Sequence, residues 1–117
     1  MMNKPIQTDD AWGRDPQVSY LRRIFNRLES AQNSFLGKLE ITPWDERLRD
    51  IREKALLLFE SAWAESNSKG ISINEEELEG LYLFCLAHLC RSRGIAIPPE
   101  ILPNNKKLQN LIKEIRS

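Results

Sequence analysis

The segment 81–90 predicts an α-helix that has no polar face. Because successive residues of a helix are turned by about 100° around its axis, the leucines of this segment point in several different directions. Only His88 interrupts the apolar surface. A helix that is apolar around its whole circumference must be covered on all sides. With 117 residues the chain has few other elements for this task, so this segment constrains the fold more than any other.

The composition indicates one soluble globular domain. Apolar residues make up 41% of the chain and charged residues 29%, which are ordinary values for such a domain. The 17 Lys and Arg residues balance the 17 Asp and Glu residues, so the net charge is zero. A general nucleic-acid-binding protein depends on an excess of Lys and Arg that faces phosphate groups, and this chain has no such excess. A local basic patch is still compatible with this balance.

The charges are unevenly distributed along the chain. Residues 67–90 contain one Lys or Arg and four Asp or Glu residues, whereas residues 91–117 contain six and two. We interpret this asymmetry as a basic C-terminal segment that packs beside an acidic middle segment. The alternative is that the basic segment forms a contact surface for an acidic partner. Charge complementarity inside a small domain is the more common arrangement, and we favour it.

Residues 1–14 are predicted to be a flexible lead-in to a single helical domain over residues 15–117. The lead-in has no apolar core of a secretory signal, but it includes Trp12, whose ring we expect to fold back onto the domain. The longest apolar run is about half of the roughly 20 residues that span a membrane, so no membrane association is expected. On one helix Cys85 and Cys90 would be separated by a rise of about 7.5 Å, which is too far for a disulfide. We therefore expect a cytoplasmic protein with reduced thiols.

Helix-capping patterns predict two helices in the first part of the chain. The first runs from residue 16 to about residue 36, with Asp15 as its cap and Gly37 at its end. The second begins with Thr42 as its cap, Pro43 as its first residue and Asp45 at the capping-box position, and it fades within residues 66–70. Helical spacing of apolar residues predicts the faces that these helices bury. Those faces comprise Val18, Leu21, Ile24, Phe25, Leu28, Ala31, Phe35 and Leu39 on the first helix and Trp44, Leu48, Ile51, Ala55, Leu58, Phe59, Ala62 and Trp63 on the second.

The second part of the chain predicts two more helices with a connector between them. Asn74 is expected to cap the third helix, with Glu77 at the capping-box position, and the helix ends near residue 93 before a glycine. Residues 95–103 contain three prolines, which exclude a regular helix, and apolar residues, which should hold the segment against the domain. Asn104 or Asn105 then caps a last helix. The predicted fold class is all-α, a small four-helix, bundle-like single domain with an apolar third helix at its centre.

Cys85, His88 and Cys90 form the one pattern in the chain that resembles a chemical site. On a helix Cys90 lies about 140° from Cys85 and about 160° from His88, so the three side chains do not converge. A structural zinc site needs four ligands of this kind, and the chain contains only these three. Cys85 and His88 are close enough on a helix to touch, yet burial should raise the pKa of the thiol and weaken it as a nucleophile. We therefore predict buried structural residues, with no catalytic residue, cofactor or metal ion.

The function that we predict is a non-enzymatic protein–protein interaction module, such as an accessory subunit, adaptor or regulator of a larger complex. The third helix needs cover on the side away from Leu81, either from residues 95–103 and the N-terminal segment or from another chain. We favour another chain, so self-association or a protein partner is expected. The predicted interface residues are Leu83, Leu86, Cys90, Ile97 and Leu102.

Two alternative functions are retained. The first is a nucleic-acid-associated regulator, which would use basic surfaces of the first and last helices. The residues of that candidate contact surface are Arg22, Arg23, Arg27, Lys106 and Lys107. The second alternative is a small enzyme or metal protein that uses Cys85 and His88. Nucleic acid is the less expected partner because the chain has no net positive charge.

Overall fold

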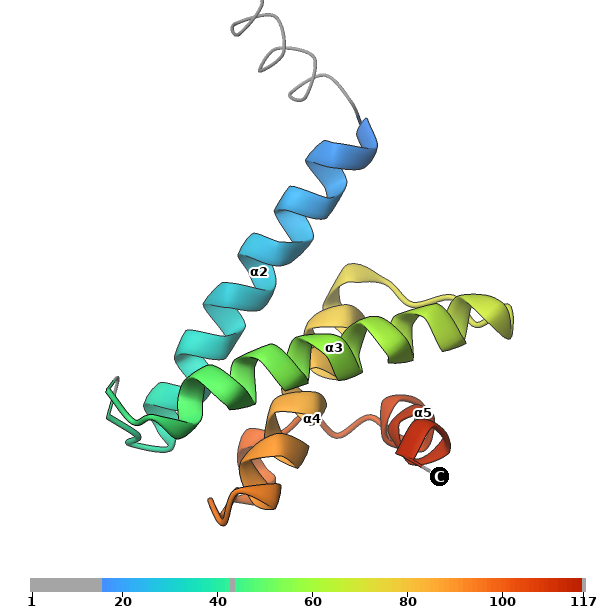
Figure 1. Ribbon diagram of the computed structural model, residues 1–117. Helices are drawn as coiled ribbons and strands as arrows, with labels where there is room; N and C mark the ends of the chain where they lie inside the picture. Colours follow the sequence, from blue (N-terminus) through green and yellow to red (C-terminus); the bar gives the residue numbers. More distant parts are fainter. Residues whose placement is uncertain (1–15, 43, 117) are drawn as a thin grey trace, which may run out of the picture.

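The helix α4 (Glu75–Ser92) lies at the centre of the fold and packs against every other α-helix of the described chain (Figure 1). The computed structural model describes residues 16–42 and 44–116. In this part of the chain, α2 (Pro16–Lys38), α3 (Arg47–Ser68) and α4 are followed by the short 3₁₀ helix η1 (Pro99–Ile101) and by α5 (Lys106–Arg116). The architecture of the described residues is all-α, with four helices packed in one domain and no strand, which confirms the predicted fold class.

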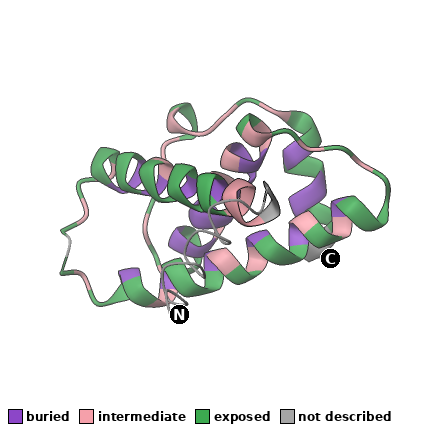
Figure 2. Ribbon diagram, turned by 90° about the horizontal axis from the view of Figure 1, so that it is seen from above, coloured by how far each residue is buried: buried purple, intermediate pink, exposed green. Residues whose placement is uncertain are grey.

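The chain itself covers α4 on most of its circumference. Nine residues of α4 are buried, and they point to all sides of the helix. Figure 2 shows the buried positions of the helices turned toward the interior of the molecule. Covering side chains come from α2, α3, the segment before η1 and α5, and examples are Ile24, Phe59, Ile97 and Leu108. Three residues of α4 are the half-buried exceptions within the apolar segment, namely Leu83, Phe84 and His88.

One polar pair is buried among these apolar side chains. The Tyr82 hydroxyl on α4 donates a hydrogen bond to the Oε1 atom of Gln32 on α2 over 2.5 Å. Tyr82 is 4% exposed and Gln32 is 8% exposed, so each polar group depends on this partner. Burial raises the pKa of Tyr82 to about 12, so the hydroxyl keeps its proton at neutral pH. Sliding α2 along α4 would leave both groups unpaired, and the pair therefore helps to fix how the two helices lie.

The capping residues predicted for α4 and α5 hold these helix starts. The Asn74 side chain accepts a hydrogen bond from the backbone N–H of Glu77 over 2.8 Å, and the Glu77 carboxylate accepts one from the Asn74 N–H over 3.1 Å. This reciprocal pair is the predicted capping box. Gly94 follows α4 with a φ of 79°, a left-handed value that favours glycine. Of the two candidates for α5, Asn105 is the cap, since its side chain accepts from the Leu108 N–H over 3.2 Å.

The turn between α2 and α3 differs from the prediction at both ends. α2 continues past Gly37, and the chain reverses at Glu40, which has a left-handed φ of 57°. Thr42 is not the cap of α3, because that helix begins at Arg47 with Glu46 as its N-cap. The Thr42 carbonyl accepts a hydrogen bond from the Asp45 N–H over 3.1 Å in a separate turn. The Asp45 carboxylate instead binds Arg47, the first residue of α3, at the backbone N–H over 3.0 Å and at the guanidinium over 2.7 Å. Hydrogen bonding from Arg47 lowers the pKa of Asp45 to about 2, and this pair starts α3 later than the sequence pattern predicts.

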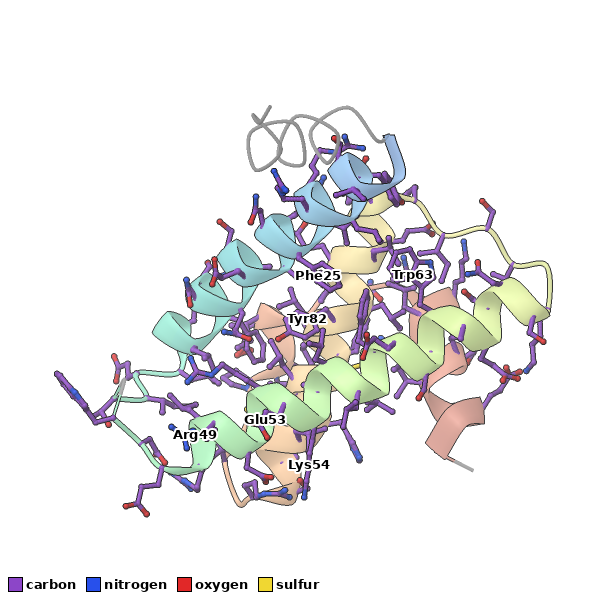
Figure 3. The ribbon with its side chains drawn as sticks, turned by 45° about the horizontal axis from the view of Figure 1, so that its top comes forward. Phe25, Arg49, Glu53, Lys54, Trp63 and Tyr82 are labelled. Carbon is purple, nitrogen blue, oxygen red and sulfur yellow. The ribbon has the colours of Figure 1, made fainter. Side chains whose placement is uncertain are left out.

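Two large apolar residues that were expected on buried faces are exposed. Trp44 precedes the start of α3 and is 86% exposed, so it does not belong to the buried face of that helix. Phe25 is 41% exposed, and Figure 1 shows that α2 and α3 diverge after the turn that joins them. Figure 3 shows Phe25 on α2 and Trp63 on α3 beside this opening. The divergence therefore explains why helical spacing overestimates the burial of α2.

Some sequence predictions concern positions that lie outside the described residues. These are the lead-in of residues 1–14 with Trp12, the Asp15 cap and Pro43.

Ion pairs join the acidic start of α4 to α2. Arg23 contacts the Glu75 carboxylate over 2.7 Å, and Arg27 contacts Glu79 over 3.3 Å. Hydrogen bonding from Arg23 is the main reason why the pKa of Glu75 lies below its ordinary value. These contacts hold the first turns of α4 against the middle of α2.

Ion pairs also join α5 to the middle of the chain. Lys107 contacts the Glu77 carboxylate of α4 over 3.1 Å, and Glu114 contacts Lys69 at the end of α3 over 2.7 Å. The hydrogen bond from the Asn74 N–H, followed by that from Lys107, lowers the pKa of Glu77. The Lys107–Glu77 pair is the kind of contact that was expected between a basic C-terminal segment and an acidic middle segment.

We expect the stability of the fold to fall at acidic pH in part through Glu75, whose ordinary pKa is 4.5. A carboxylate whose pKa is lowered by folding contributes stability above its unfolded-state pKa and loses that contribution as the pH falls toward its folded-state pKa. The melting temperature of the wild type should therefore drop between about pH 5 and about pH 3, and Glu75→Gln should flatten this part of the curve. Circular dichroism during thermal unfolding at several pH values measures both.

The matched control for this experiment is Glu76→Gln. Glu76 lies in the same first turn of α4, is exposed, and forms no ion pair with a described residue. Its variant should keep the pH dependence of the wild type. A pH curve for Glu75→Gln that coincides with the wild-type curve would contradict the stabilising role of the Arg23–Glu75 pair.

The approach of α5 to α4 leaves little space beside Gly80. A Cβ atom at Gly80 would lie 3.0 Å from Leu108 Cδ1 and 3.4 Å from Pro103 Cγ. We expect Gly80→Leu to lower the free energy of unfolding by about 1–3 kcal/mol, because the larger side chain must displace α5 and the segment that precedes it. Gly37→Leu is the control, since Gly37 is also helical and a Cβ atom there meets nothing within 4 Å. Urea unfolding compares the two, and equal losses would contradict the close contact at Gly80.

Candidate functional site

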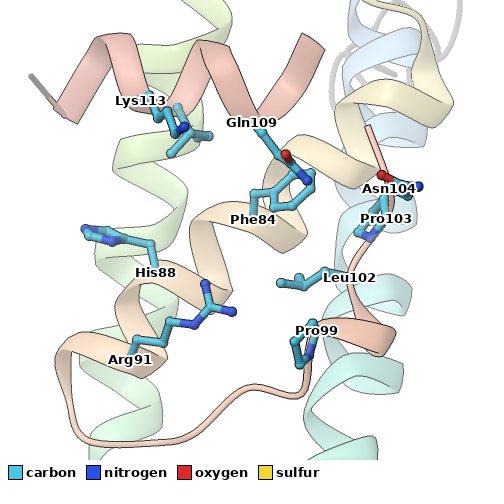
Figure 4. Close-up of a pocket in the computed structure, with 10 residues that line it drawn as sticks. Phe84, His88, Arg91, Pro99, Leu102, Pro103, Asn104, Gln109 and Lys113 are labelled. Atoms are coloured by element: carbon cyan, nitrogen blue, oxygen red, sulfur yellow. The ribbon is translucent and has the colours of Figure 1, made fainter. Parts of the chain in front are cut away.

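A groove runs along the side of α4 that the other helices leave partly open (Figure 4). Its floor is α4, one wall is α5, and the other wall is the connecting segment, by which we mean residues 95–105 including η1. The groove encloses about 460 Å³. The lining side chains come from all three elements and are Phe84, His88, Arg91, Pro99, Leu102, Pro103, Asn104, Gln109, Ile112 and Lys113.

The local sequence explains the floor and one wall. Phe84, His88 and Arg91 are spaced by four and three residues, so they lie on one face of α4. Proline prevents the connecting segment from forming a longer helix, and η1 is flanked by extended backbone at Pro98 (φ −64°, ψ 129°) and Leu102 (φ −100°, ψ 148°). An extended segment has no helical ridge to fit between α4 and α5, so the space along Phe84 stays open.

The groove combines apolar surface with basic side chains, and no acidic residue of the described chain lines it. Figure 4 shows the connecting segment on one side of Phe84 and the basic residues His88, Arg91 and Lys113 on the other. None of the residues that line the groove is Asp or Glu. Arg91 is exposed, forms no ion pair with a described residue, and directs its guanidinium toward the middle of the groove. The site therefore offers positive charge directly beside apolar surface.

The structure separates the five residues that were predicted to form an interface. Leu86 and Cys90 are fully buried and Ile97 is 7% exposed, so in this fold these three side chains pack inside the chain. Their cover comes from the chain's own core cluster, whereas the sequence interpretation assigned it to a second chain. Leu102 is half-buried and lines the groove. Leu83 is also half-buried but does not line it.

The predicted basic contact surface is divided by ion pairs. Arg23 and Arg27 contact carboxylates at the start of α4 from one side, and Lys107 contacts another carboxylate there from α5. Arg22 and Lys106 are exposed and form no ion pair with a described residue. Three of the five charges are therefore partly neutralised within the chain.

The two thiols belong to the core. Cys85 and Cys90 are both 0% exposed. Burial raises the pKa of Cys85 to about 12, and burial raises the pKa of Cys90 as well. His88 is half-buried and lines the groove. Within the described part of the chain, no group of three or more His, Cys, Asp or Glu side chains is placed to hold a metal ion.

Most residues of the groove were not identified from the sequence. Phe84, Arg91, Gln109 and Lys113 line it, and none of them is among the predicted site residues. The available signal is the polar break that His88 makes in the apolar helix, since Arg91 continues the same face three residues later. The walls gave no such signal, because they form only when the connecting segment and α5 fold back onto α4.

No protein-family model, curated protein or solved structure matches this chain. No helix in residues 16–42 and 44–116 combines the length and the apolar character that crossing a lipid bilayer requires.

We expect both thiols to be protected in the folded protein. The thiolate is the reactive form of cysteine, and a buried thiol with a raised pKa stays protonated at neutral pH. Iodoacetamide should therefore leave Cys85 and Cys90 unmodified in the native protein, whereas both should be labelled after denaturation. Mass spectrometry measures the labelling. Rapid native modification of Cys85 would contradict its burial and would favour the alternative that this residue takes part in catalysis.

Proposed function

We propose that this chain is a non-enzymatic protein-interaction module, an accessory subunit, adaptor or regulator, that binds a partner protein in the groove beside α4. The observation that carries the proposal is the lining of the groove. Half-buried apolar side chains lie next to basic ones at the place where the chain's own cover of α4 is incomplete. Binding there adds to the cover of a helix that is already buried on most of its circumference.

The energetics of burial support this use of the groove. Phe84 and Leu102 are only half-buried. Complete burial of a large apolar side chain is worth about 1.5–3 kcal/mol relative to exposure, so a partner that covers these two gains part of that free energy. The amides of Asn104 and Gln109 also line the groove and offer both donors and acceptors to a bound backbone.

Other exposed apolar side chains provide a weaker basis for an interface. Trp44 is 86% exposed, Leu57 63% and Phe25 41%. Trp44 precedes α3, Leu57 lies within α3 and Phe25 lies on α2, so the three belong to different parts of the chain. Single exposed apolar residues are ordinary features of soluble proteins, whereas a groove that joins the half-buried side chains of Phe84 and Leu102 to basic groups is a more specific feature.

The two alternative functions have less support from the described residues. The basic surface for nucleic acid is reduced by the ion pairs of Arg23, Arg27 and Lys107. The enzyme alternative depends on a nucleophilic thiol, and burial raises the pKa of Cys85. We therefore propose neither as the function.

The test places a photo-crosslinking amino acid at Gln109, on the α5 wall of the groove, in the full chain expressed in its own cells. We expect one discrete crosslinked adduct, because a segment bound in the groove lies within reach of this side chain. The mass of the adduct identifies the partner, and an adduct with twice the mass of the chain indicates self-association.

The matched control for crosslinking is the same amino acid at Asn33. Asn33 is also an exposed helical residue with an amide side chain, but it lies on α2 and does not line the groove. The adduct found at Gln109 should be absent at Asn33. The same adducts at both positions, or none at Gln109, would contradict the proposal that the groove binds a partner.

A further inference from the structure

Among the described residues, the groove has basic lining residues and no acidic one. Arg91 and Lys113 line it, and no described Asp or Glu does. Glu114, which follows Lys113 in the sequence, pairs with Lys69 over 2.7 Å. Arg91 forms no ion pair with a described residue. Charge complementarity across an interface favours an occupant that supplies carboxylates.

The groove as a whole has the size of a compact ligand site, and part of its lining is apolar. Phe84 forms its floor, Leu102 lies on the connecting segment and Ile112 on α5. Its volume of about 460 Å³ lies within the range of roughly 300–1,000 Å³ that is typical of such sites. Space of this size accepts one large apolar side chain with its adjoining backbone rather than a whole helix.

The basic residues are spread along one side of the apolar floor. In Figure 4, Lys113 on α5 lies toward the top of the view and Arg91 on α4 toward the bottom, with Phe84 at a height between them. A segment that runs along this side of the groove with its apolar side chain on Phe84 passes a basic group toward each of its ends. A peptide in which acidic residues precede and follow an apolar residue matches this order.

We infer that the occupant of the groove is an acidic segment of a partner protein in which carboxylate side chains flank one large apolar side chain. The inference rests on the proposed function and states the chemistry of the partner. A second copy of this chain fits less well, because its densest acidic group already pairs within the fold through Glu75, Glu77 and Glu79. The acidic segment therefore belongs to a different protein.

The experiment selects binders of the full chain from a library of random peptides displayed on phage. The enriched peptides should contain more Asp and Glu than the starting library, placed around an aromatic or branched apolar residue. Replacing that apolar residue with Ser in a synthetic copy of the consensus peptide should weaken binding by about tenfold or more, and added salt should weaken binding further. Fluorescence polarisation measures both effects.

Variants of the chain show whether these peptides bind in the groove. Arg91→Gln combined with Lys113→Gln should weaken the consensus peptide by about tenfold or more, since both charges beside the apolar floor are lost. The control combines Arg22→Gln with Lys106→Gln, which removes two exposed cations that do not line the groove. The control should bind like the wild type, and thermal melts of both variants show that each remains folded.

Several outcomes would overturn the inference. Enrichment of basic or uncharged peptides, no enrichment at all, or equal losses in the two double variants would each exclude an acidic segment in this groove. A specific adduct at Gln109 together with any of these results leaves the interaction module intact and rejects only the acidic chemistry. When crosslinking at Gln109 also fails, both the partner chemistry and the proposed function are rejected.

Discussion

Water cannot solvate α4 without a large loss of free energy, because its apolar side chains point to all sides of the helix. A single neighbouring helix buries only one face of it, so α2 and α3 leave part of its circumference uncovered. α5 and the connecting segment complete most of the cover after the chain leaves α4 and turns at Gly94. The need to bury α4 on all sides therefore determines where α2, α3, α5 and the connecting segment lie.

Polar interactions decide how these elements are oriented rather than whether they associate. Burial of a large apolar side chain is worth about 1.5–3 kcal/mol, whereas an exposed ion pair is worth about 0–1 kcal/mol. Apolar contacts alone are not directional and would tolerate sliding or rotation of the helices. The Tyr82–Gln32 hydrogen bond fixes α2 against α4, and the Lys107–Glu77 pair fixes α5. Burial therefore assembles the fold, and a few directional contacts select one arrangement of it.

Features that depend on neighbouring residues were predictable from the sequence. The Asn74 cap is formed within one helical turn, so its pattern identified the start of α4 correctly. The start of α3 was predicted wrongly, because Thr42 does not cap the helix and the Asp45 carboxylate binds Arg47, at which α3 begins. Trp44 followed the helical spacing of apolar residues but lies before the helix, where that spacing has no meaning.

Features that depend on distant segments were not predictable in the same way. The apolar character of α4 correctly showed that the helix needs cover, but its residues do not say whether the same chain or another one provides it. Leu86 and Cys90 were assigned to an interface for this reason, and the chain's own core encloses them. Only Leu102 of the predicted interface lines the groove, since α5 and the connecting segment build the walls only after folding.

The residues around the groove are difficult to explain by stability alone. Arg91 lies in the last turn of α4, where a positive charge is favourable by about 0.3–1 kcal/mol, so its presence by itself has a structural explanation. That explanation does not extend to Phe84, which stays half-buried on the same face. A sequence selected only for a closed core would place a helix or a longer apolar segment over Phe84, whereas this chain has a proline-rich segment that leaves space there. The proposed binding of a partner accounts for incomplete apolar cover and positive charge at the same place, whereas packing of the core accounts for neither.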